Sequence, residues 1–291
     1  HSQQLVFLAP MWEEFFTYVS PEKLKGIAGV ANIGLDTNWC GHHFAQANWY
    51  AFGRLAWNPR LTSKEIADEW LTQTFVDKQL IAKQQRPESN RRKVIKENHS
   101  QLVQTRKIGF NEAYAALLDM MLRSREACVD YMMPIGLHHI FKFDHHYGPE
   151  PDGFKAHYPL EWCPVYYHQA DSAGVGFDRT SRGSGATLQY PEPYCTLYDN
   201  PATCPEEYLL WFHHLPWDYK MKSGRTLIDE LDFRYQRGVS EVIDFIATWQ
   251  QAKPYIDAQR WQEVNDRLTT QLIDAREWQV VCTKYFGGFA R

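Results

Sequence analysis

Two short apolar runs at the start of the chain restrict its fold more than any other feature. Residues 5–9 (LVFLA) and 27–33 (IAGVANI) are rich in branched side chains, and a polar stretch of helical character separates them. This spacing is typical of a strand–helix–strand unit. Neither run alternates with polar residues, which favours parallel strands covered on both faces. The runs predict either the last two strands of an α/β barrel or part of an open parallel sheet.

The chain changes character after the Asn58-Pro59 pair. A helix predicted from about residue 42 to 57 ends at this proline, and Thr62 with Glu65 has the spacing of a capping box for the next helix. Apolar periodicity predicts further helices at about 110–132, 206–214, 226–248 and 255–282, with Pro205 at the start of the second of these. The fold class expected is α/β followed by all-α. Residues 1–58 would form the end of a (β/α)8 TIM barrel, and residues 59–291 a helical domain.

Residues 134–205 interrupt the helical pattern. This region holds much of the proline and glycine of the chain, together with many aromatic residues and histidines. A loop of this length inside a compact domain usually has a function. We therefore treat it as a long loop region within the helical domain and as a place to look for ligand contacts.

Composition excludes several classes of function. The net charge of −4 and the pI near 6.3 give no general attraction for nucleic acid or for an anionic membrane. No apolar stretch approaches the roughly 20 residues needed to cross a bilayer. The aromatic content of 15% suits either a carbohydrate-binding surface or a large core. Because the sequence starts without Met or a signal-type leader, directly before an apolar run, we expect that residue 1 is not a natural terminus.

Polar and aromatic side chains follow both predicted strands. Trp12 comes after the first strand, and Asn38, Trp39 and His43 come after the second. Ligands of α/β barrels and sheets meet the loops at these strand ends. A sugar ring needs an apolar surface beneath it and directional hydrogen bonds at its hydroxyl groups. We predict these four residues as substrate contacts, although the tryptophans alternatively pack the barrel against the helices.

The sequence assigns no catalytic residue and no metal or cofactor site. Glu13 and Asp36 follow successive strands, but any carboxylate near a pocket would qualify equally well. Histidine pairs occur at 42–43, 138–139, 145–146 and 213–214, and no HExxH motif accompanies them. The six cysteines show no CxxC spacing, and we expect them to be reduced. A metal-dependent hydrolase that uses the His-rich loop stays an alternative interpretation.

Long motifs distributed over nearly the whole chain resemble glycoside hydrolase family 67, the α-glucuronidases. They are GVANIG at 29–34, DTNW at 36–39, AQAN at 45–48, GRLAWNP at 53–59, MPIGLHH at 133–139, HHYGP at 145–149, YYH at 166–168, GFDRT at 176–180, WFHH at 211–214, PWDY at 216–219 and KSGRT at 222–226.

The resemblance implies an enzyme that removes glucuronic acid, often 4-O-methylated, from the terminal xylose of xylo-oligosaccharides. In the family a β-rich domain precedes the barrel, a helical domain that often carries the dimer contact follows it, and the α-1,2 bond is hydrolysed with inversion. The general acid and base follow earlier barrel strands, which would place them before residue 1. The partners expected are therefore the xylo-oligosaccharide, the missing N-terminal portion and a second copy. The protein would be soluble and bacterial, cytoplasmic or periplasmic, and this chain alone would be inactive.

The resemblance also implies an aromatic contact on the xylose side of the substrate. Relatives commonly have a tryptophan soon after the Gly-Pro of the HHYGP motif, whereas this chain has Asp152 and Phe154. Trp162 is the nearest tryptophan and is predicted to make this contact. A carbohydrate-binding or dimerisation module without catalysis of its own is the other alternative, because the aromatic excess also fits such a module.

Overall fold

A computed structural model describes residues 29–30, 35, 38–76, 81, 108–143 and 147–290 of the chain. The described residues are mostly helical, which confirms the all-α part of the predicted fold class. The predicted strand at 5–9 lies outside these residues, and so does most of the one at 27–33. The barrel end therefore stays a prediction.

Two compact units divide the chain. The described residues of unit 1 fall within 1–125 and 244–269, and those of unit 2 fall within 126–243 and 270–291. Three long helices have residues in both units: α5 (Phe110–Met132), α9 (Leu227–Ala252) and α10 (Ala258–Ala290). This division into units does not test the boundary expected at residue 58 between the barrel and the helical domain, which stays a prediction.

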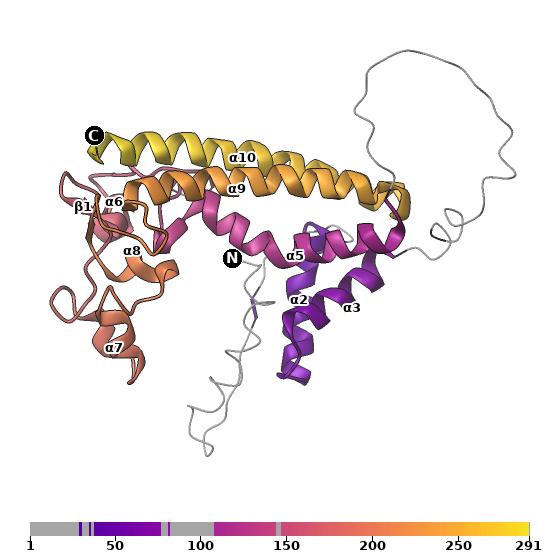
Figure 1. Cartoon of the computed structure of the whole chain (residues 1–291), viewed down its shortest axis with the longest axis horizontal. Coiled ribbons are helices and arrows are strands. Elements are labelled where there is room, and N and C mark those ends of the chain that lie inside the picture. Colours follow the sequence, from indigo (N-terminus) through magenta and orange to yellow (C-terminus); the bar gives the residue numbers. More distant parts are fainter. Residues whose placement is uncertain are drawn as a thin grey trace, which may run out of the picture. The chain divides into compact units, whose positions relative to one another are not determined.

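Helices α2 (His43–Trp57) and α3 (Ser63–Phe75) belong to unit 1 and pack against each other (Figure 1). Helix α2 has the bounds expected from the sequence, because the Nδ1 of His42 accepts the N–H of Ala45 (3.2 Å) at one end and Asn58 leaves the helix at the other. At the start of α3, Thr62 and Glu65 form the predicted capping box. Each side chain accepts the main-chain N–H of the other residue, at 3.2 and 2.8 Å.

Aromatic rings fill the core of unit 1. Trp70 and Phe75 of α3 are buried, and so is Trp249 of α9. The ring centroid of Phe75 lies 5.3 Å from that of Trp249, and Phe44 of α2 lies 5.3 Å from Trp70. In unit 1, many aromatic residues of the chain therefore form the core, which was one of the two explanations for the high aromatic content.

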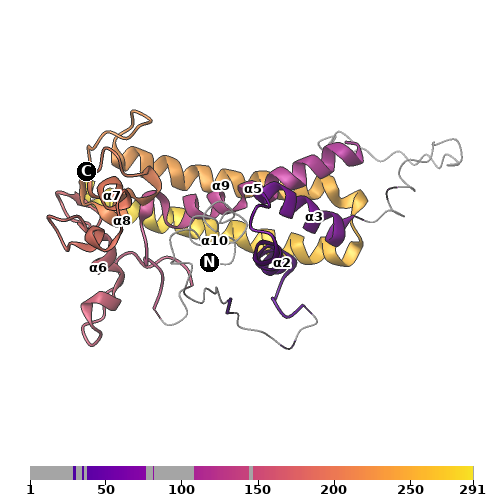
Figure 2. The same ribbon diagram turned by 90° about the horizontal axis from the view of Figure 1, so that it is seen from below.

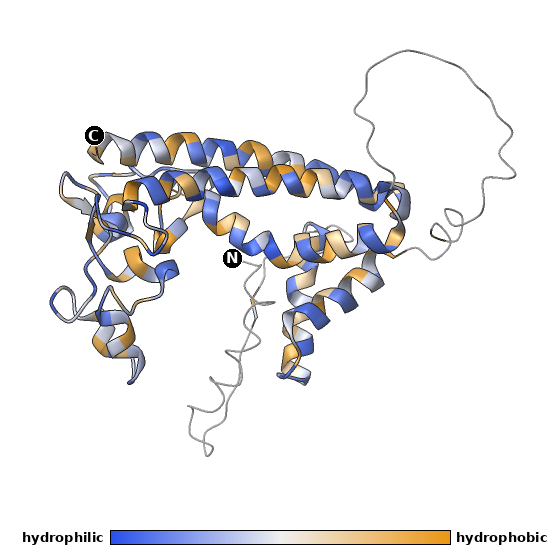
Figure 3. Cartoon of the chain, in the orientation of Figure 1, coloured by the Kyte–Doolittle hydropathy of each residue, from blue (hydrophilic) through white to orange (hydrophobic). Residues whose placement is uncertain are grey.

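The core of unit 2 lies along α9 and the C-terminal half of α10. Tyr235, Trp278 and Phe286 are among its buried residues. Figure 3 shows hydrophobic and hydrophilic residues alternating along these helices, as expected for helices with one buried face. The predicted bounds were 226–248 and 255–282. Both helices begin later, at Leu227 and Ala258, and also end later, at Ala252 and Ala290.

The region predicted as a long loop consists of short elements. They are α6 (Pro164–His168), α7 (Tyr194–Asp199), 3-10 helices at Pro134–Gly136, Leu160–Trp162 and Ala186–Gln189, and the strand β1 (Gly174–Val175). Strand β1 pairs antiparallel with β2 (Leu215–Pro216), so that Val175 lies opposite Leu215. In Figures 1 and 2, α6 and α8 (Leu209–Phe212) lie toward the C-terminal end of α10, and α7 lies farther away from that end.

The helix predicted at 206–214 is shorter and less regular than expected. A 3-10 turn (Glu206–Tyr208) leads into α8 (Leu209–Phe212), and Pro205 precedes the turn as its N-cap residue, one position earlier than predicted. The extended backbone of β2 follows almost at once, because Leu215 pairs with Val175. Tertiary pairing therefore ends the helix two residues early. No helix of the described residues is long and apolar enough to cross a membrane.

Candidate functional site

Asn38 and Trp39 lie in the turn that precedes α2. The N–H of Gly41 donates to the main-chain oxygen of Asn38 (2.8 Å) and closes this turn. The Oδ1 atom of Asn38 is buried, and no described residue donates a hydrogen bond to it. Trp39 is 39% exposed, and its ring packs at 5.7 Å from that of Trp49. Their roles as substrate contacts stay predictions, with an available acceptor and an available aromatic surface in their favour.

His43 is tied to the helical core instead of standing free. Its Nε2 atom lies 2.9 Å from a carboxylate oxygen of Glu263 in α10, and its ring meets the edge of Phe75 at 5.7 Å. The side chain is only 15% exposed. This geometry gives His43 a packing role, and its predicted contact with substrate stays a prediction. Trp12 lies outside the described residues.

Trp162 belongs to a group of exposed aromatic residues in unit 2. Trp162 is 58% exposed, Phe154 is 59% exposed and Tyr147 is 67% exposed. The Trp162 ring lies 5.8 Å from that of Tyr158, which in turn stacks on Phe143 at 5.6 Å. We call residues 147–162 the exposed aromatic segment. Exposed aromatic side chains are candidates for a binding surface, because flat rings suit the apolar face of a sugar.

The described parts of the His-rich loop carry hydrogen bonds and ring contacts. The Nε2–H of His168 donates to the carbonyl of Pro151 (2.7 Å). Outside the loop, the Nδ1 of His214 lies 2.8 Å from the carbonyl of Gly176, which belongs to the loop. Within 108–143 and 147–290, no three His, Cys, Asp or Glu side chains are arranged to hold a metal ion. His145 and His146 lie outside these ranges, so the metal-dependent alternative stays open at this point.

Arg179 is a functional candidate that the sequence did not single out. It follows β1, and its N–H donates to the carbonyl of Phe212 (2.9 Å). The residue is 8% exposed, and its guanidinium lies between two rings, 3.8 Å from the centroid of Trp211 and 4.2 Å from that of Phe177. Its Nη1 donates to the main-chain oxygen of Trp211 (2.5 Å). Burial lowers the pKa of Arg179.

Successive ring contacts lead from Phe177 back to Trp211 and so form a closed circuit that includes Arg179. The centroid distances along it are 5.0, 5.5, 4.3, 5.8 and 5.2 Å. We call this the Arg179 cluster, and its members are Arg179, Phe177, Tyr166, Tyr167, His139, His138 and Trp211. Four separate segments of the sequence supply them, at 138–139, 166–167, 177–179 and 211, which is why no local pattern predicts the cluster.

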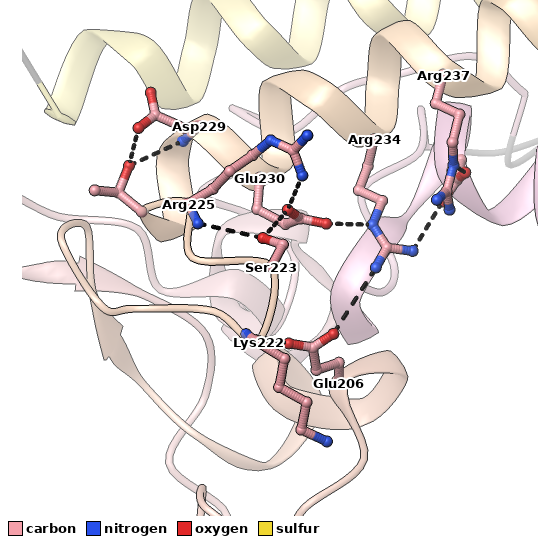
Figure 4. A network of polar contacts seen from close by, with 10 residues as sticks. Glu206, Lys222, Ser223, Arg225, Asp229, Glu230, Arg234 and Arg237 are labelled. Atoms are coloured by element: carbon pink, nitrogen blue, oxygen red, sulfur yellow. Dashed lines mark hydrogen bonds and ion pairs between the residues drawn. The ribbon is translucent and has the colours of Figure 1, made fainter.

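Two buried carboxylates form a separate polar network in unit 2 (Figure 4). Asp130 of α5 is 3% exposed and accepts from the Nε of Arg237 (2.5 Å), with Arg234 at 3.5 Å. Glu230 of α9 is 2% exposed and accepts from Arg234 (2.7 Å) and from Arg225 (3.1 Å). Both carboxylates are therefore held by arginines of α9 and the segment before it.

The network leaves neither carboxylate available for proton transfer to a ligand. Burial raises the pKa of Asp130 and outweighs the pull of Arg237 and Arg234. For Glu230, burial acts in the same direction, but hydrogen bonds from Arg234 and its neighbours lower the pKa. We interpret the network as a structural link between α5 and α9.

A comparison with known protein families tests the resemblance that the motifs indicate. The model of the glycosyl hydrolase family 67 C-terminus matches residues 40–103 and 86–291. The chain belongs to glycoside hydrolase family 67. The resemblance stated from its motifs is confirmed, and the match includes the helices that the structure describes.

Curated relatives of this family 67 chain are α-glucuronidases of fungi. Alpha-glucuronidase A of Emericella nidulans is 32% identical, alpha-glucuronidase A of Aspergillus tubingensis is 29% identical and alpha-glucuronidase of Hypocrea jecorina is 28% identical. Each similarity covers 97% of this chain but only 31–32% of the relative. The chain therefore spans less than a third of the length of these relatives, and the part it matches is the C-terminal part of the family.

Proposed function

We propose that this chain is the C-terminal part of an α-glucuronidase that acts on xylan fragments. The reaction would be hydrolysis of the α-1,2 bond between glucuronic acid, or its 4-O-methyl ether, and the terminal xylose of a xylo-oligosaccharide, with inversion at the anomeric carbon. The observation that carries this proposal is the similarity to α-glucuronidases along 97% of the chain. The fungal origin of these relatives leaves the bacterial source and the compartment as predictions.

The catalytic carboxylates would belong to polypeptide that precedes residue 1. An inverting glycosidase needs two carboxyl groups about 6.5–9.5 Å apart, one to protonate the leaving oxygen and one to activate water. Among the described residues, the buried carboxylates Asp130 and Glu230 are both engaged by arginines. This supports a role for the chain in binding and assembly instead of bond cleavage.

The chain would supply walls of the substrate site and a contact between two copies. Trp162 of the exposed aromatic segment and Trp39 before α2 offer partly exposed rings for a sugar. Asn38 offers a buried acceptor without a donor among the described residues. Trp12 and His43 complete the proposed contacts. Light scattering of the longer protein checks the proposed homodimer.

The decisive experiment compares two proteins. One is this chain alone, and the other is the same chain joined to the preceding N-terminal portion. Both are incubated with aldotriouronic acid, and NMR records the anomeric form of the released 4-O-methylglucuronic acid. We expect hydrolysis only by the longer protein, with the β anomer formed first. Turnover by the 291-residue chain, or none by the longer protein, would contradict the proposal.

Metal analysis and sugar binding, measured on the same two proteins, separate the alternatives. Stoichiometric zinc in the longer protein, with activity lost on chelation, would favour the metal-dependent hydrolase. Sugar binding by the chain, without hydrolysis by the longer protein, would favour a carbohydrate-binding module.

A further inference from the structure

Arg179 carries a positive charge into the interior of unit 2. The residue is 8% exposed, and no described carboxylate forms an ion pair with it. The neighbouring Asp178 is engaged elsewhere, since its carboxylate accepts from the N–H (3.0 Å) and hydroxyl (2.6 Å) of Thr180. Buried cations are ordinarily paired, because removing a charge from water is costly. The rings of Trp211 and Phe177 compensate only in part.

The guanidinium keeps most of its hydrogen-bonding capacity. It has five N–H groups, and its one hydrogen bond within the described residues runs from Nη1 to the main-chain oxygen of Trp211. The planar fork matches the two oxygens of a carboxylate. The two rings on either side hold this fork in place before any ligand arrives, which reduces the entropy lost on binding.

The ring of His138 contacts the indole of Trp211, which also contacts Arg179. Its Nδ1 is buried and has no hydrogen-bond partner among the described residues. Its ring meets that of Trp211 at 5.2 Å, while the guanidinium of Arg179 lies 3.8 Å from the same indole. Burial, together with the charges of His139 and Arg179, lowers the pKa of His138. The ring is therefore neutral at pH 7 and is suited to a hydroxyl group, which both donates and accepts.

The backbone around the cluster is held in unusual conformations. His139 has a φ of 60°, and Gln169, which follows Tyr166 and Tyr167 at the end of α6, has a φ of 43°. Neither is glycine, and side chains seldom adopt this left-handed region. Such residues are concentrated at ligand sites, where the surrounding structure fixes them.

We propose that the Arg179 cluster is a binding site for a sugar acid, with the guanidinium on the carboxylate, His138 on a hydroxyl group and the aromatic rings along the sugar ring. The site lies within unit 2 and uses no residue of the exposed aromatic segment. The choice of a uronate among carboxylates rests on the proposed function. The site would hold a glucuronic acid group of the substrate chain or of the released product.

Binding to the 291-residue chain tests this site without depending on hydrolysis. Calorimetry compares D-glucuronate with D-glucose, which lacks the carboxylate, and with glutarate, which lacks the ring. We expect glucuronate to bind at least about tenfold more tightly than either. Equal binding of glucose would remove the role of the cation, and equal binding of glutarate would remove the role of the sugar ring. Either result overturns the proposal.

Three variants locate the binding. Arg179→Gln removes the cation, Arg179→Lys keeps the charge but loses the fork, and Arg182→Gln is the matched control at an exposed arginine three residues away. We expect the first two to weaken glucuronate binding at least about tenfold, and the control to change it less than about twofold. Wild-type affinity in Arg179→Gln with an unchanged circular dichroism spectrum would overturn the proposal.

A measurement on the unmodified chain covers the case in which both Arg179 variants fail to fold. Glucuronate should shift the imidazole Cε1–H resonance of His138, and glucose should not. An unmoved resonance at saturating glucuronate also overturns the proposal. Glucuronate binding by the chain without hydrolysis by the longer protein would contradict the proposed function alone, whereas hydrolysis without binding at Arg179 would contradict this site alone.

Discussion

Trp249 of α9 and Trp261 of α10 exchange hydrogen bonds. The indole N–H of Trp249 donates to the main-chain oxygen of Trp261 (2.9 Å), and the indole N–H of Trp261 donates to the main-chain oxygen of Trp249 (3.1 Å). Both residues are buried, so each bond satisfies polar groups that water cannot reach. The pair joins the end of one helix to the start of the next within unit 1.

Replacing Trp249 by Phe should destabilise the protein. The carbonyl of Trp261 would lose its donor inside the core, and an unsatisfied buried group of this kind costs about 1–3 kcal/mol. Urea unfolding of the wild type and the variant measures the change in free energy. Trp57→Phe is the matched control, because Trp57 is 87% exposed and its replacement should change stability by less than about 0.5 kcal/mol. Equal effects of the two substitutions would contradict the role of the exchange.

Gly238→Ala should also destabilise, although alanine favours helices over glycine by about 1 kcal/mol. Gly238 lies in α9 against α5, where a Cβ atom would stand 2.5 Å from the main-chain nitrogen of Tyr131. That contact is with backbone, which cannot rotate away, so the helices must separate at a cost of about 1–3 kcal/mol.

Gly53→Ala provides the opposite case for comparison. Gly53 lies in α2 and is exposed, and no atom would come within 4 Å of an added Cβ. We expect a gain of about 0.5–1 kcal/mol from helix propensity. Thermal unfolding of both variants measures whether each substitution lowers or raises the stability. A stabilising Gly238→Ala would show that α5 and α9 do not approach as closely as described.

The helices were predictable where local signals were strong. The bounds of α5, at 110–132, follow from apolar periodicity and from Pro134, and the Thr62–Glu65 capping box fixes the start of α3. Local rules failed at α8, which ends at Phe212 because β2 pairs with β1 directly afterwards. That pairing joins residues about 40 positions apart, and no sequence period reveals it.

For the candidate site, the sequence predicted only a region rich in aromatic residues and histidines, and not which residues come together. The sequence drew attention to Trp162 and to the histidines of the 134–205 region, and the structure describes Trp162 as an exposed side chain. Arg179 appeared only inside the GFDRT motif. Its burial between Phe177 and Trp211 depends on the pairing of residues 177–179 with 210–212. A charged residue within an aromatic-rich stretch was the available signal, and it does not separate a buried arginine from a solvated one.

His168 should make stability depend on pH. The N–H of Ala170 donates to its Nδ1 (3.0 Å), so its Nε2 carries the proton that is donated to Pro151, and the neutral ring is fixed. Burial lowers the pKa of His168 to about 4 from the ordinary value of 6.5. Between these values the unfolded chain binds more protons than the folded one. The free energy of unfolding should therefore fall as pH drops from 6.5 to 4, by about 3 kcal/mol from this residue.

His168→Gln tests that slope, since the amide can still donate to Pro151 but does not titrate. Urea unfolding at a series of pH values from 4 to 7.5 should show a flatter profile for this variant. The exposed His157, replaced by Gln in the same way, should leave the slope as it is. A slope unchanged by His168→Gln would show that other groups cause the acid sensitivity.

Asp130→Asn should cost much more stability than a matched change at the surface. The neutral amide no longer forms ion pairs with Arg237 and Arg234 of α9. Breaking a buried ion pair typically costs about 3–5 kcal/mol. Because the side chain of Arg237 is 38% exposed, and because burial already disfavours the charged form of Asp130 and raises its pKa, we expect a smaller loss of about 1–2 kcal/mol. The control is Asp119→Asn, whose bridge to Arg123 is open to solvent. Similar losses in the two variants would remove the network as a link between α5 and α9.

Trp162→Ala should weaken substrate binding by the longer protein while leaving its stability unchanged. The side chain is 58% exposed, so little core packing is lost. Pairs of aromatic rings gain about 0.5–1.5 kcal/mol, and a similar gain for a ring against a sugar corresponds to a rise in KM of about twofold to twelvefold on its removal. Leu160→Ala in the same 3-10 turn is the control, since Leu160 is 51% exposed and has no ring. If both variants keep the KM of the wild type for aldotriouronic acid, the xylose side of the substrate rests on other residues, and Phe154 becomes the next aromatic to replace. If both raise KM equally, the turn matters for its shape and not for the ring of Trp162.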